Sequence, residues 1–336
     1  METKVLKSSQ DSINEACKLL SQGQVVAIPT ETVYGLFADA TSAKACEGIF
    51  AAKDRPQDNP LIVHVSDYDM LHKVALTVSE DAMKLAEAFW PGPLTMILKK
   101  TSLIPDDVSA GLDTAGIRMP SNPVVLEIIS KTGLPLAGPS ANRSGRPSPT
   151  NAQDVFFDME GRIPLILDGG NCDIGVESTV VSMTEETPII FRPGFVTQKQ
   201  IEKVLQKPVL LSKGISEELP ADEKVLSPGL KHKHYAPKAQ VTIISGDFAK
   251  YKEKIEKDGA VALCFDEYKD RLNVTCVCYG SEKNSAQQAV ELFTALRHLD
   301  EIGAKTVYAM MPPLEGVGLA VYNRLLRAAA FRVVNL

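Results

Sequence analysis

The fold is decided by residues 25–36, which read VVAIPTETVYGL. The first four residues are apolar and mostly β-branched, which predicts a short buried strand. A helical apolar pattern over residues 12–20 and the helix-stopping Gly23 precede them. The polar residues that follow do not suit a core, and open α/β sheets bind ligands where their strands end. This stretch therefore predicts an α/β sheet with a binding segment directly after one strand.

Two further segments carry complementary polar groups. Residues 53–61 read KDRPQDNPL, and residues 138–150 read GPSANRSGRPSPT after an apolar run over 134–137. Cations, hydroxyls and amides together suit an anion with many acceptor oxygens, so a phosphorylated ligand such as a nucleoside triphosphate is expected. No Gly-x-x-x-x-Gly-Lys-Ser/Thr run occurs, so side chains rather than a P-loop backbone would bind the phosphates. The alternative is that Lys53 and Arg55 are solvated charges after a helix.

Length and composition bound the class of protein. The chain has 336 residues, 44% of them hydrophobic, which exceeds what one core usually accommodates and predicts two domains. The net charge of −6 argues against a large nucleic-acid-binding surface, so direct tRNA binding is not expected. Without a long apolar run or a signal-like N-terminus, we expect a cytoplasmic protein with no membrane segment. The six cysteines form no Cys-x-x-Cys pair and indicate neither a disulfide framework nor a zinc site.

Apolar runs separated by helical patterns predict the order of elements. In the first part of the chain, the expected strands are 25–28, 61–65, 94–98, 117–119, 134–137, 165–167 and 179–183. The pattern lapses near Lys207, and a linker is expected over 208–239. Beyond it, the expected strands are 241–244, 260–264, 274–279 and 306–310, alternating with helices over 248–255, 286–299 and 319–330. This alternation indicates a second, smaller α/β domain.

Taken together, the motifs resemble those of one enzyme family. They are PTETVYGL at 29–36, Lys-x-Arg at 53–55, Ser-x-Asn at 140–142, PSPT at 147–150, ESTV at 177–180, RPG at 192–194, HYAP at 234–237, and NRL with RAA at 323–329. In this order, they resemble the threonylcarbamoyl-AMP synthase family, the Sua5/YrdC/YwlC group, in its long two-domain Sua5 form. The resemblance implies a YrdC-like mixed, twisted sheet with helices over 1–207, a linker over 208–239 that forms an active-site lid, and a Rossmann-like α/β domain over 240–336.

The resemblance also implies a reaction. A nucleotidyltransferase of this family would use L-threonine, bicarbonate or CO2, and ATP to give threonylcarbamoyl-AMP and pyrophosphate. Mg2+ would accompany ATP, with no protein metal site. A separate transferase would then use the product for threonylcarbamoyladenosine modification of tRNA.

Residue roles follow from the resemblance position by position. The catalytic residues would be Lys53, Arg55, Ser140 and Asn142. The ATP-binding residues would be Lys53, Arg55, Asn59, Thr114, Ser140, Ser148, Arg192 and Tyr235. The L-threonine-binding residues would be Thr32, His64, Arg118, Gly138 and Ser178, with Arg118 gripping the carboxylate.

Several residues have a purely structural alternative. His64 lies in an apolar run and suits a satisfied core histidine as well as a ligand. Thr32 and Ser178 suit turns or helix caps, and Arg118 and Arg192 suit surface charges. Glu31 is interpreted as a solvated carboxylate, with a general base or Mg2+ ligand as the alternative. Asp54 departs from the family pattern, in which glycine is frequent, and would either weaken the local positive field or face solvent.

Other functions remain open at this point. An RNA-binding module without nucleotidyl transfer is the main rival, although the basic loops contain few aromatic residues. His232 and His234 alternate as metal ligands can, but two histidines without further ligands make a weak site. Gly316-Val317-Gly318 lacks the third glycine of a dinucleotide fingerprint and is better explained by tight loop packing.

Overall fold

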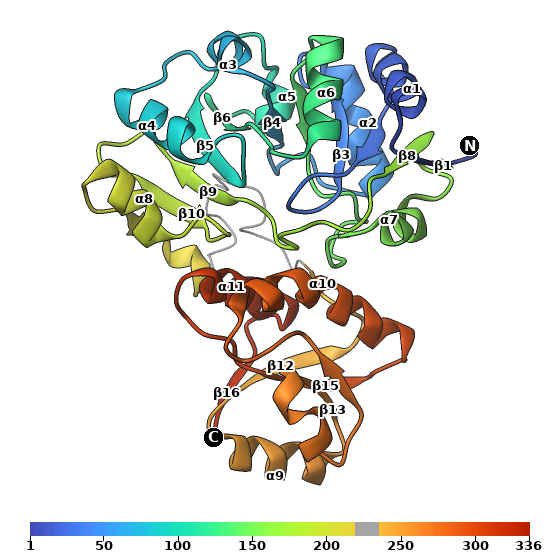
Figure 1. Ribbon diagram of the computed structural model, residues 1–336, viewed down its shortest axis with the longest axis vertical. Helices are drawn as coiled ribbons and strands as arrows, with labels where there is room; N and C mark the ends of the chain where they lie inside the picture. The colour runs from blue at the N-terminus through green and yellow to red at the C-terminus, as the bar shows by residue number, and fades with distance from the viewer. Residues whose placement is uncertain (219–234) are drawn as a thin grey trace.

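The computed structural model describes residues 1–218 and 235–336, which form two α/β units (Figure 1). Among the described residues, the strands of the first unit are β1 (Lys4–Lys7), β2 (Val26–Ile28), β3 (Gly35–Asp39), β4 (Ile62–His64), β5 (Leu94–Lys99), β6 (Thr114–Arg118), β7 (Leu136–Gly138), β8 (Leu165–Asp168), β9 (Thr179–Ser182), β10 (Ile189–Arg192) and β11 (Leu210–Leu211). Their order in the sheet is β1-β8-β2-β3-β7-β4-β6-β5-β9-β10-β11. The pairs β2–β3, β3–β7 and β4–β7 are antiparallel, whereas β4–β6 and β5–β9 are parallel. The mixed sheet is therefore confirmed.

Helices surround this sheet. They are α1 (Gln10–Ser21), α2 (Ala43–Lys53), α3 (Tyr68–Val74), α4 (Glu80–Phe89), α5 (Asp106–Ser109), α6 (Pro123–Thr132), α7 (Ala152–Met159) and α8 (Gln198–Leu205), and the short 3-10 helix Lys213–Ile215 follows β11. Capping residues fix the ends that matter for the site. The Ser42 hydroxyl caps the start of α2, and Asp54 ends it in the left-handed region with φ 52°. Lys53 is thus the last helical residue, and the chain reverses direction immediately before Arg55.

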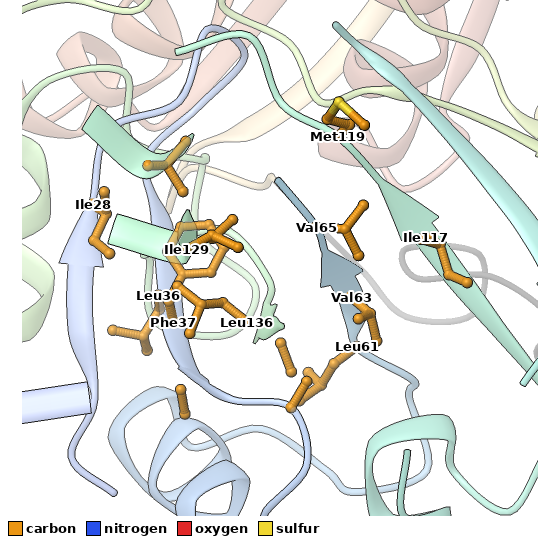
Figure 2. Close-up of a cluster of buried hydrophobic side chains, with 14 of the residues drawn as sticks. Ile28, Leu36, Phe37, Leu61, Val63, Val65, Ile117, Met119, Ile129 and Leu136 are labelled. Atoms are coloured by element: carbon orange, nitrogen blue, oxygen red, sulfur yellow. The ribbon is translucent and has the colours of Figure 1, made fainter. Parts of the chain in front are cut away.

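The core of the first unit lies beneath its central strands. Figure 2 shows one cluster of buried apolar side chains that come from β2, β3, β4, β6 and β7, with Ile129 of α6 close to those of β3 and β7. Leu36, Val63, Ile117 and Leu136 have no exposed surface. Full burial of such a side chain contributes about 1.5–3 kcal/mol. Because neighbouring residues of a strand point to opposite faces, burying Val63 directs Ile62 and His64 to the other face of β4.

The second unit has a parallel sheet. Among the described residues, its elements are β12 (Gln240–Ser245), α9 (Phe248–Asp258), β13 (Val261–Cys264), the 3-10 helix Asp266–Arg271, β14 (Cys276–Cys278), α10 (Ser285–Glu301), β15 (Thr306–Met310), α11 (Val317–Ala328) and β16 (Val333–Asn335). The strand order is β14-β13-β15-β12-β16, with every pairing parallel. Helices α10 and α11 lie between this sheet and the first unit, while α9 covers the far face (Figure 1). The predicted Rossmann-like layering is confirmed.

The glycines before α11 serve packing. A Cβ on Gly318 would lie 2.5 Å from the carbonyl oxygen of Pro313, closer than real Cβ atoms come. Gly316 precedes the helix with φ 55°, a left-handed conformation that glycine adopts readily. These contacts support the packing interpretation of this motif.

Sequence patterns predicted the apolar strands better than the edges. Strand β15 has the predicted bounds, whereas β1, β3, β10, β11 and β16 were not predicted. Four of the missed strands, β1, β10, β11 and β16, are short and lie at or near the sheet edges, so their apolar periodicity is weak. Strand β3 is central, but it begins inside the polar motif at 29–36, which was interpreted as a binding segment. The first sheet ends at β11, beyond residue 207, and the predicted domain limits remain predictions. Among the described residues, no helix combines the length and apolar character needed to cross a membrane.

Candidate functional site

A cavity of about 750 Å³, including its open mouth, lies on one face of the first sheet. Gly35, Ile62, His64, Arg118 and Gly138 contribute its floor from β3, β4, β6 and β7, four neighbouring strands. The residues that the sequence predicted and that line it are Thr32, Lys53, Arg55, His64, Arg118, Gly138, Ser140, Asn142, Ser178, Arg192 and Tyr235. The site therefore extends across the sheet face as well as beyond the strand ends.

Gly138 cannot carry a side chain in this floor. A Cβ there would lie 2.6 Å from both the Leu36 carbonyl oxygen and the Phe37 ring. A Cβ on Gly35 would lie 2.3 Å from the same ring. Phe37 thus fills the space beside both glycines and leaves their backbone groups at the cavity surface.

Lys53 joins the two predicted polar segments. Its ammonium group donates to the backbone carbonyls of Ser140 and, at 2.5 Å, Asn142. The side chain is buried, and burial lowers the pKa of Lys53 well below its ordinary value. The Ser140 hydroxyl in turn donates to Oδ1 of Asn142 at 2.5 Å. The interpretation of Lys53 as a solvated charge is wrong, because the lysine is a buried tether between α2 and the loop after β7.

Two arginines add positive charge to the cavity, Arg192 as a buried residue and Arg55 as a partly buried one. Burial lowers the pKa of Arg55 and of Arg192 to about 10 each. Arg55 donates from Nη2 to the Asn59 and Pro60 carbonyls at 3.3 Å, and its buried Nε has no hydrogen-bond partner among the described residues. Arg192 donates to the carbonyl of Ser178 at 3.0 Å and to its hydroxyl at 3.1 Å. Arg192 is therefore not a surface charge, and buried cations such as Lys53 and Arg192 are typical of an anion site.

Arg118 is held on three sides in another part of the cavity. Its Nη1 donates to the Thr32 hydroxyl at 3.0 Å, its Nε donates to the Gly92 carbonyl at 3.2 Å, and its Nη2 lies 2.6 Å from Oε1 of Glu31. The Arg118 and Glu31 side chains are 4% and 6% exposed. The prediction of a solvated Glu31 is therefore wrong, because this carboxylate neutralises Arg118 inside the protein.

His64 is buried but faces the cavity. Its ring meets that of Phe37 edge-on at 4.9 Å, and Nδ1 lies 3.1 Å from the Ile62 carbonyl oxygen. Burial, reinforced by the charge of Arg118, lowers the pKa of His64 to about 3. The imidazole is therefore neutral over the physiological pH range.

Three predicted nucleotide contacts do not line the cavity. Thr114 begins β6, four residues before Arg118 and so about 13 Å along the strand. Asn59 is buried and its carbonyl accepts from Arg55. Ser148 is fully buried and donates to Oε1 of Glu177 at 2.5 Å.

Glu177 lines the cavity and was not predicted as a site residue. It is the single acidic residue among the described lining residues. Within the ESTV motif, Ser178 was predicted as a site residue and Glu177 was not. The side-chain partner of Glu177 is Arg324, which lies 147 residues further along the chain. Sequence spacing alone carries no signal for such a contact.

Tyr235 connects the cavity to the second unit. The side chain is buried at the cavity wall, and its ring centroid lies 5.2 Å from that of Phe293 in α10. Residues 219–234 of the predicted lid, including His232 and His234, lie outside the described residues. Within the described residues, no group of three or more histidine, cysteine or acidic side chains has the geometry of a metal site.

Asp54 lies away from the cavity. Its carboxylate is more than half exposed and pairs with Arg143 at 3.1 Å and Arg162 at 3.0 Å. These two arginines hold the pKa of Asp54 below its usual value. The left-handed backbone at this position explains why glycine would be frequent here.

A sheet-face cavity lined by cations, hydroxyls and amides defines the class as an α/β protein with a polar, cation-rich cavity on one face of its sheet. Residues 18–194 match a family described as "Telomere recombination", and residues 196–330 match the "Threonylcarbamoyl-AMP synthase, C-terminal domain" family. The chain belongs to the threonylcarbamoyl-AMP synthase family, whose members are enzymes that form an AMP-containing product.

Relatives and solved structures agree with this assignment. The threonylcarbamoyl-AMP synthase of Bacillus subtilis is 42% identical, covering 99% of this chain and 97% of that protein. The structure of P. abyssi Sua5 complexed with L-threonine has a TM-score of 0.93 and 37% identity, covering 100% of both chains. The threonylcarbamoyl-AMP synthase of Vibrio vulnificus is 33% identical and covers only 47% of this chain but 86% of its own length. Shorter members of the family thus exist beside the two-domain form.

Proposed function

We propose that this chain condenses L-threonine, bicarbonate or CO2, and ATP into threonylcarbamoyl-AMP and pyrophosphate. The carrying observation is that three cations, the buried Lys53 and Arg192 and the partly buried Arg55, share one cavity with the separately held Arg118. This arrangement offers positive charge for a triphosphate and a guanidinium group for a carboxylate. Family membership and the threonine complex of P. abyssi Sua5 support the same assignment.

The proposed threonine half of the cavity comprises Thr32, His64, Arg118, Gly138 and Ser178. Arg118 would grip the substrate carboxylate with N–H groups not committed to its present partners. His64 would stay neutral and act as a hydrogen-bonding group, because its pKa is about 3. Gly138 contributes backbone groups alone and leaves room for the substrate.

The proposed nucleotide half comprises Lys53, Arg55, Ser140, Asn142 and Arg192 at the cavity surface, supported by Ser148 and Asn59, with Tyr235 at the wall and Thr114 as a further predicted contact. Because burial lowers the pKa of Lys53, a bound triphosphate would stabilise its charged form. Mg2+ would enter as the ATP complex, since Glu177 is already engaged by Ser148 and Arg324 and the described residues offer no three-ligand group.

The chemistry requires orientation and charge neutralisation rather than a protein nucleophile. The threonine amine would attack CO2 and lose a proton, which gives a carbamate. A carbamate oxygen would then attack the α-phosphorus, and pyrophosphate would leave with the electrons of the broken P–O bond. Lys53, Arg55 and Arg192 would neutralise the charge on the phosphates as this bond breaks.

Beyond the reaction itself, we propose a cytoplasmic setting in which a separate transferase uses the product to modify tRNA. The net charge of −6 supports transfer of a small intermediate over direct tRNA binding by this chain. The family assignment favours the enzyme over an RNA-binding module.

The test is pyrophosphate release by purified protein with ATP, Mg2+, bicarbonate and L-threonine, omitting each component in turn. Release should require threonine and bicarbonate, and mass spectrometry should detect the adenylate. D-threonine is the matched control for the amino-acid site. Folded protein that binds RNA in a salt-sensitive manner but releases no pyrophosphate would replace this proposal with the binding-module alternative.

A further inference from the structure

An arginine of the second unit reaches the acidic residue of the cavity wall. Arg324 on α11 has no exposed surface, and its Nε donates to Oε2 of Glu177 at 2.9 Å. Its Nη2 donates to the backbone carbonyl of Glu177 at 3.0 Å, and its Nη1 donates to the Pro193 carbonyl at 2.5 Å. The Arg324 guanidinium group therefore fixes two segments of the first unit, one at Glu177 and one at Pro193, both of them distant in sequence from α11.

Both segments lead to predicted nucleotide contacts. The second carboxylate oxygen of Glu177 accepts from the Ser148 hydroxyl at 2.5 Å. Pro193 directly follows Arg192, which lines the cavity. Arg324 thus reaches Ser148 through Glu177 and reaches Arg192 through the adjoining backbone, without lining the cavity itself.

Resting on the proposed function, we propose that Arg324 is a positioning residue for the nucleotide half of the cavity. It acts through Glu177 on Ser148 and through the Pro193 carbonyl on Arg192. The second unit thereby completes the ATP site of the first unit, in addition to packing against it.

The threonine half has anchors of its own. The Ser178 hydroxyl lies 2.8 Å from that of Thr95 on β5 and also accepts from Arg192 at 3.1 Å, while Arg118 is held by Glu31 and Thr32. All these anchors belong to the first unit. A loss of Arg324 should therefore affect ATP more than threonine, which separates positioning from a general loss of structure.

The charge of Glu177 provides a second readout. Burial raises the pKa of Glu177, whereas the charges of Arg324 and then Arg192 lower it. Together the lowering effects exceed the effect of burial, so the net shift of the Glu177 pKa is downward. Lys53 and Tyr235 also face this carboxylate. Without Arg324 the effect of burial is less opposed, and Glu177 should take up a proton at higher pH than in the wild type.

The experiment compares full-length Arg324→Lys, Arg324→Met and the double variant Arg324→Met/Glu177→Gln with the wild type. Lysine keeps the charge but cannot reproduce the planar fork, and the double variant removes the pair without leaving a buried unpaired charge. Arg332→Lys is the matched control, because Arg332 donates at 3.1 Å to the Val241 carbonyl within the second unit. Folding is checked by thermal unfolding.

We expect KM for ATP to rise about tenfold in Arg324→Lys and more in the other variants. KM for threonine should stay within about twofold throughout, and Arg332→Lys should behave as wild type. Arg324→Met should lose ATP affinity as the pH falls. The double variant lacks the Glu177 carboxylate, so its ATP affinity should not show this additional fall at low pH. If Arg324→Met does not fold, the lysine and double variants decide the question from the two KM values.

Wild-type KM for ATP in every Arg324 variant that folds would overturn the proposal. So would a parallel rise of both KM values, which would indicate a structural role alone. Titration with a non-hydrolysable ATP analogue measures nucleotide binding in the same variants without turnover. A wild type that binds the analogue but releases no pyrophosphate would refute the proposed function and still allow the positioning comparison.

Discussion

The two halves of the cavity are stabilised from different parts of the chain. In the threonine half, Arg118 is fixed by Glu31 and Thr32 within the first unit. In the nucleotide half, Ser148 depends on Glu177, which is held by Arg324 from the second unit. We therefore expect the proposed amino-acid site to depend mainly on the first unit and the proposed nucleotide site to depend on both units.

Further contacts reinforce the dependence of the nucleotide half on the second unit. Arg297 of α10 donates to the Pro147 carbonyl at 2.5 Å and to the buried Asp158 carboxylate at 2.7 Å. The Ala236 amide donates to the Gly145 carbonyl at 2.9 Å. These contacts hold the loop just before Ser148, at Gly145 and Pro147, and the helix after it, at Asp158, and a cut between the units would remove them.

The largest expected effect comes from Lys53→Met, a change in the first unit that removes a cation of the nucleotide half. The change removes a buried cation and the donor to the Ser140 and Asn142 carbonyls. We expect kcat/KM for ATP to fall by about 10²- to 10³-fold, as when one charge-stabilising donor is lost from an active site.

Steady-state kinetics check the Lys53 prediction against Lys100→Met. Lys100 likewise donates to a loop carbonyl, that of Ile104 at 2.7 Å, but does not line the cavity. Equal losses in the two variants would mean that the effect of Lys53 is structural.

Arg118→Lys should impair the threonine half of the cavity. A lysine cannot contact Glu31, Thr32 and the Gly92 carbonyl together, so the group proposed to bind the substrate carboxylate loses its orientation. We expect KM for threonine to rise about 10- to 100-fold while KM for ATP stays within about threefold. Arg143→Lys, at an exposed ion pair, is the control. A rise confined to ATP would reverse the assignment of the two halves.

Local sequence predicted the contents of the cavity better than its supports. Lys53, Ser140 and Asn142 sit in short motifs next to predicted element ends, and they meet as the resemblance implied. Glu31 was misassigned and Glu177 was missed. Their arginine partners lie 87 and 147 positions further along the chain, so the contacts depend on strand order and on the docking of α11.

Two further properties were beyond local sequence. The burial that lowers the pKa of His64 arises from packing across four strands, although the apolar run over 61–65 predicted the strand itself. The position of Asp54 depends on a left-handed backbone at the end of α2, which the residue type does not reveal. Sequence patterns therefore predict secondary-structure elements and motifs, whereas predicting the charge state and ion pairs of a residue requires the tertiary structure.

A smaller effect concerns stability. The pKa of His64 is about 3 when folded and about 6.5 when unfolded. Below about pH 6.5 the unfolded chain binds a proton that the folded chain excludes, so stability is full above that pH and is lost as the pH falls toward 3. From about pH 7.5 to about pH 5, His64 should cost the fold about 2 kcal/mol.

Urea unfolding at both pH values measures this dependence in the wild type and in His64→Gln. The variant should lose this part of the pH dependence, whereas His72→Gln, at an exposed histidine, should retain it. An unchanged pH dependence in His64→Gln would show that His64 is protonated in the folded protein, and would place a charge beside Arg118 in the threonine half.

The smallest effect is expected for Asp54→Gly, next to the most sensitive cation. Because the Asp54 carboxylate pairs with Arg143 and Arg162 at the surface, its removal should leave the cavity charge unaltered. Glycine also adopts the φ of 52° at this position without the steric cost that aspartate bears. Both KM values should stay within about twofold and the melting temperature should hold or rise slightly. A marked fall in KM for ATP would mean instead that Asp54 weakens the positive field around Lys53, and the nucleotide half would then depend on surface charge as well as on its buried anchors.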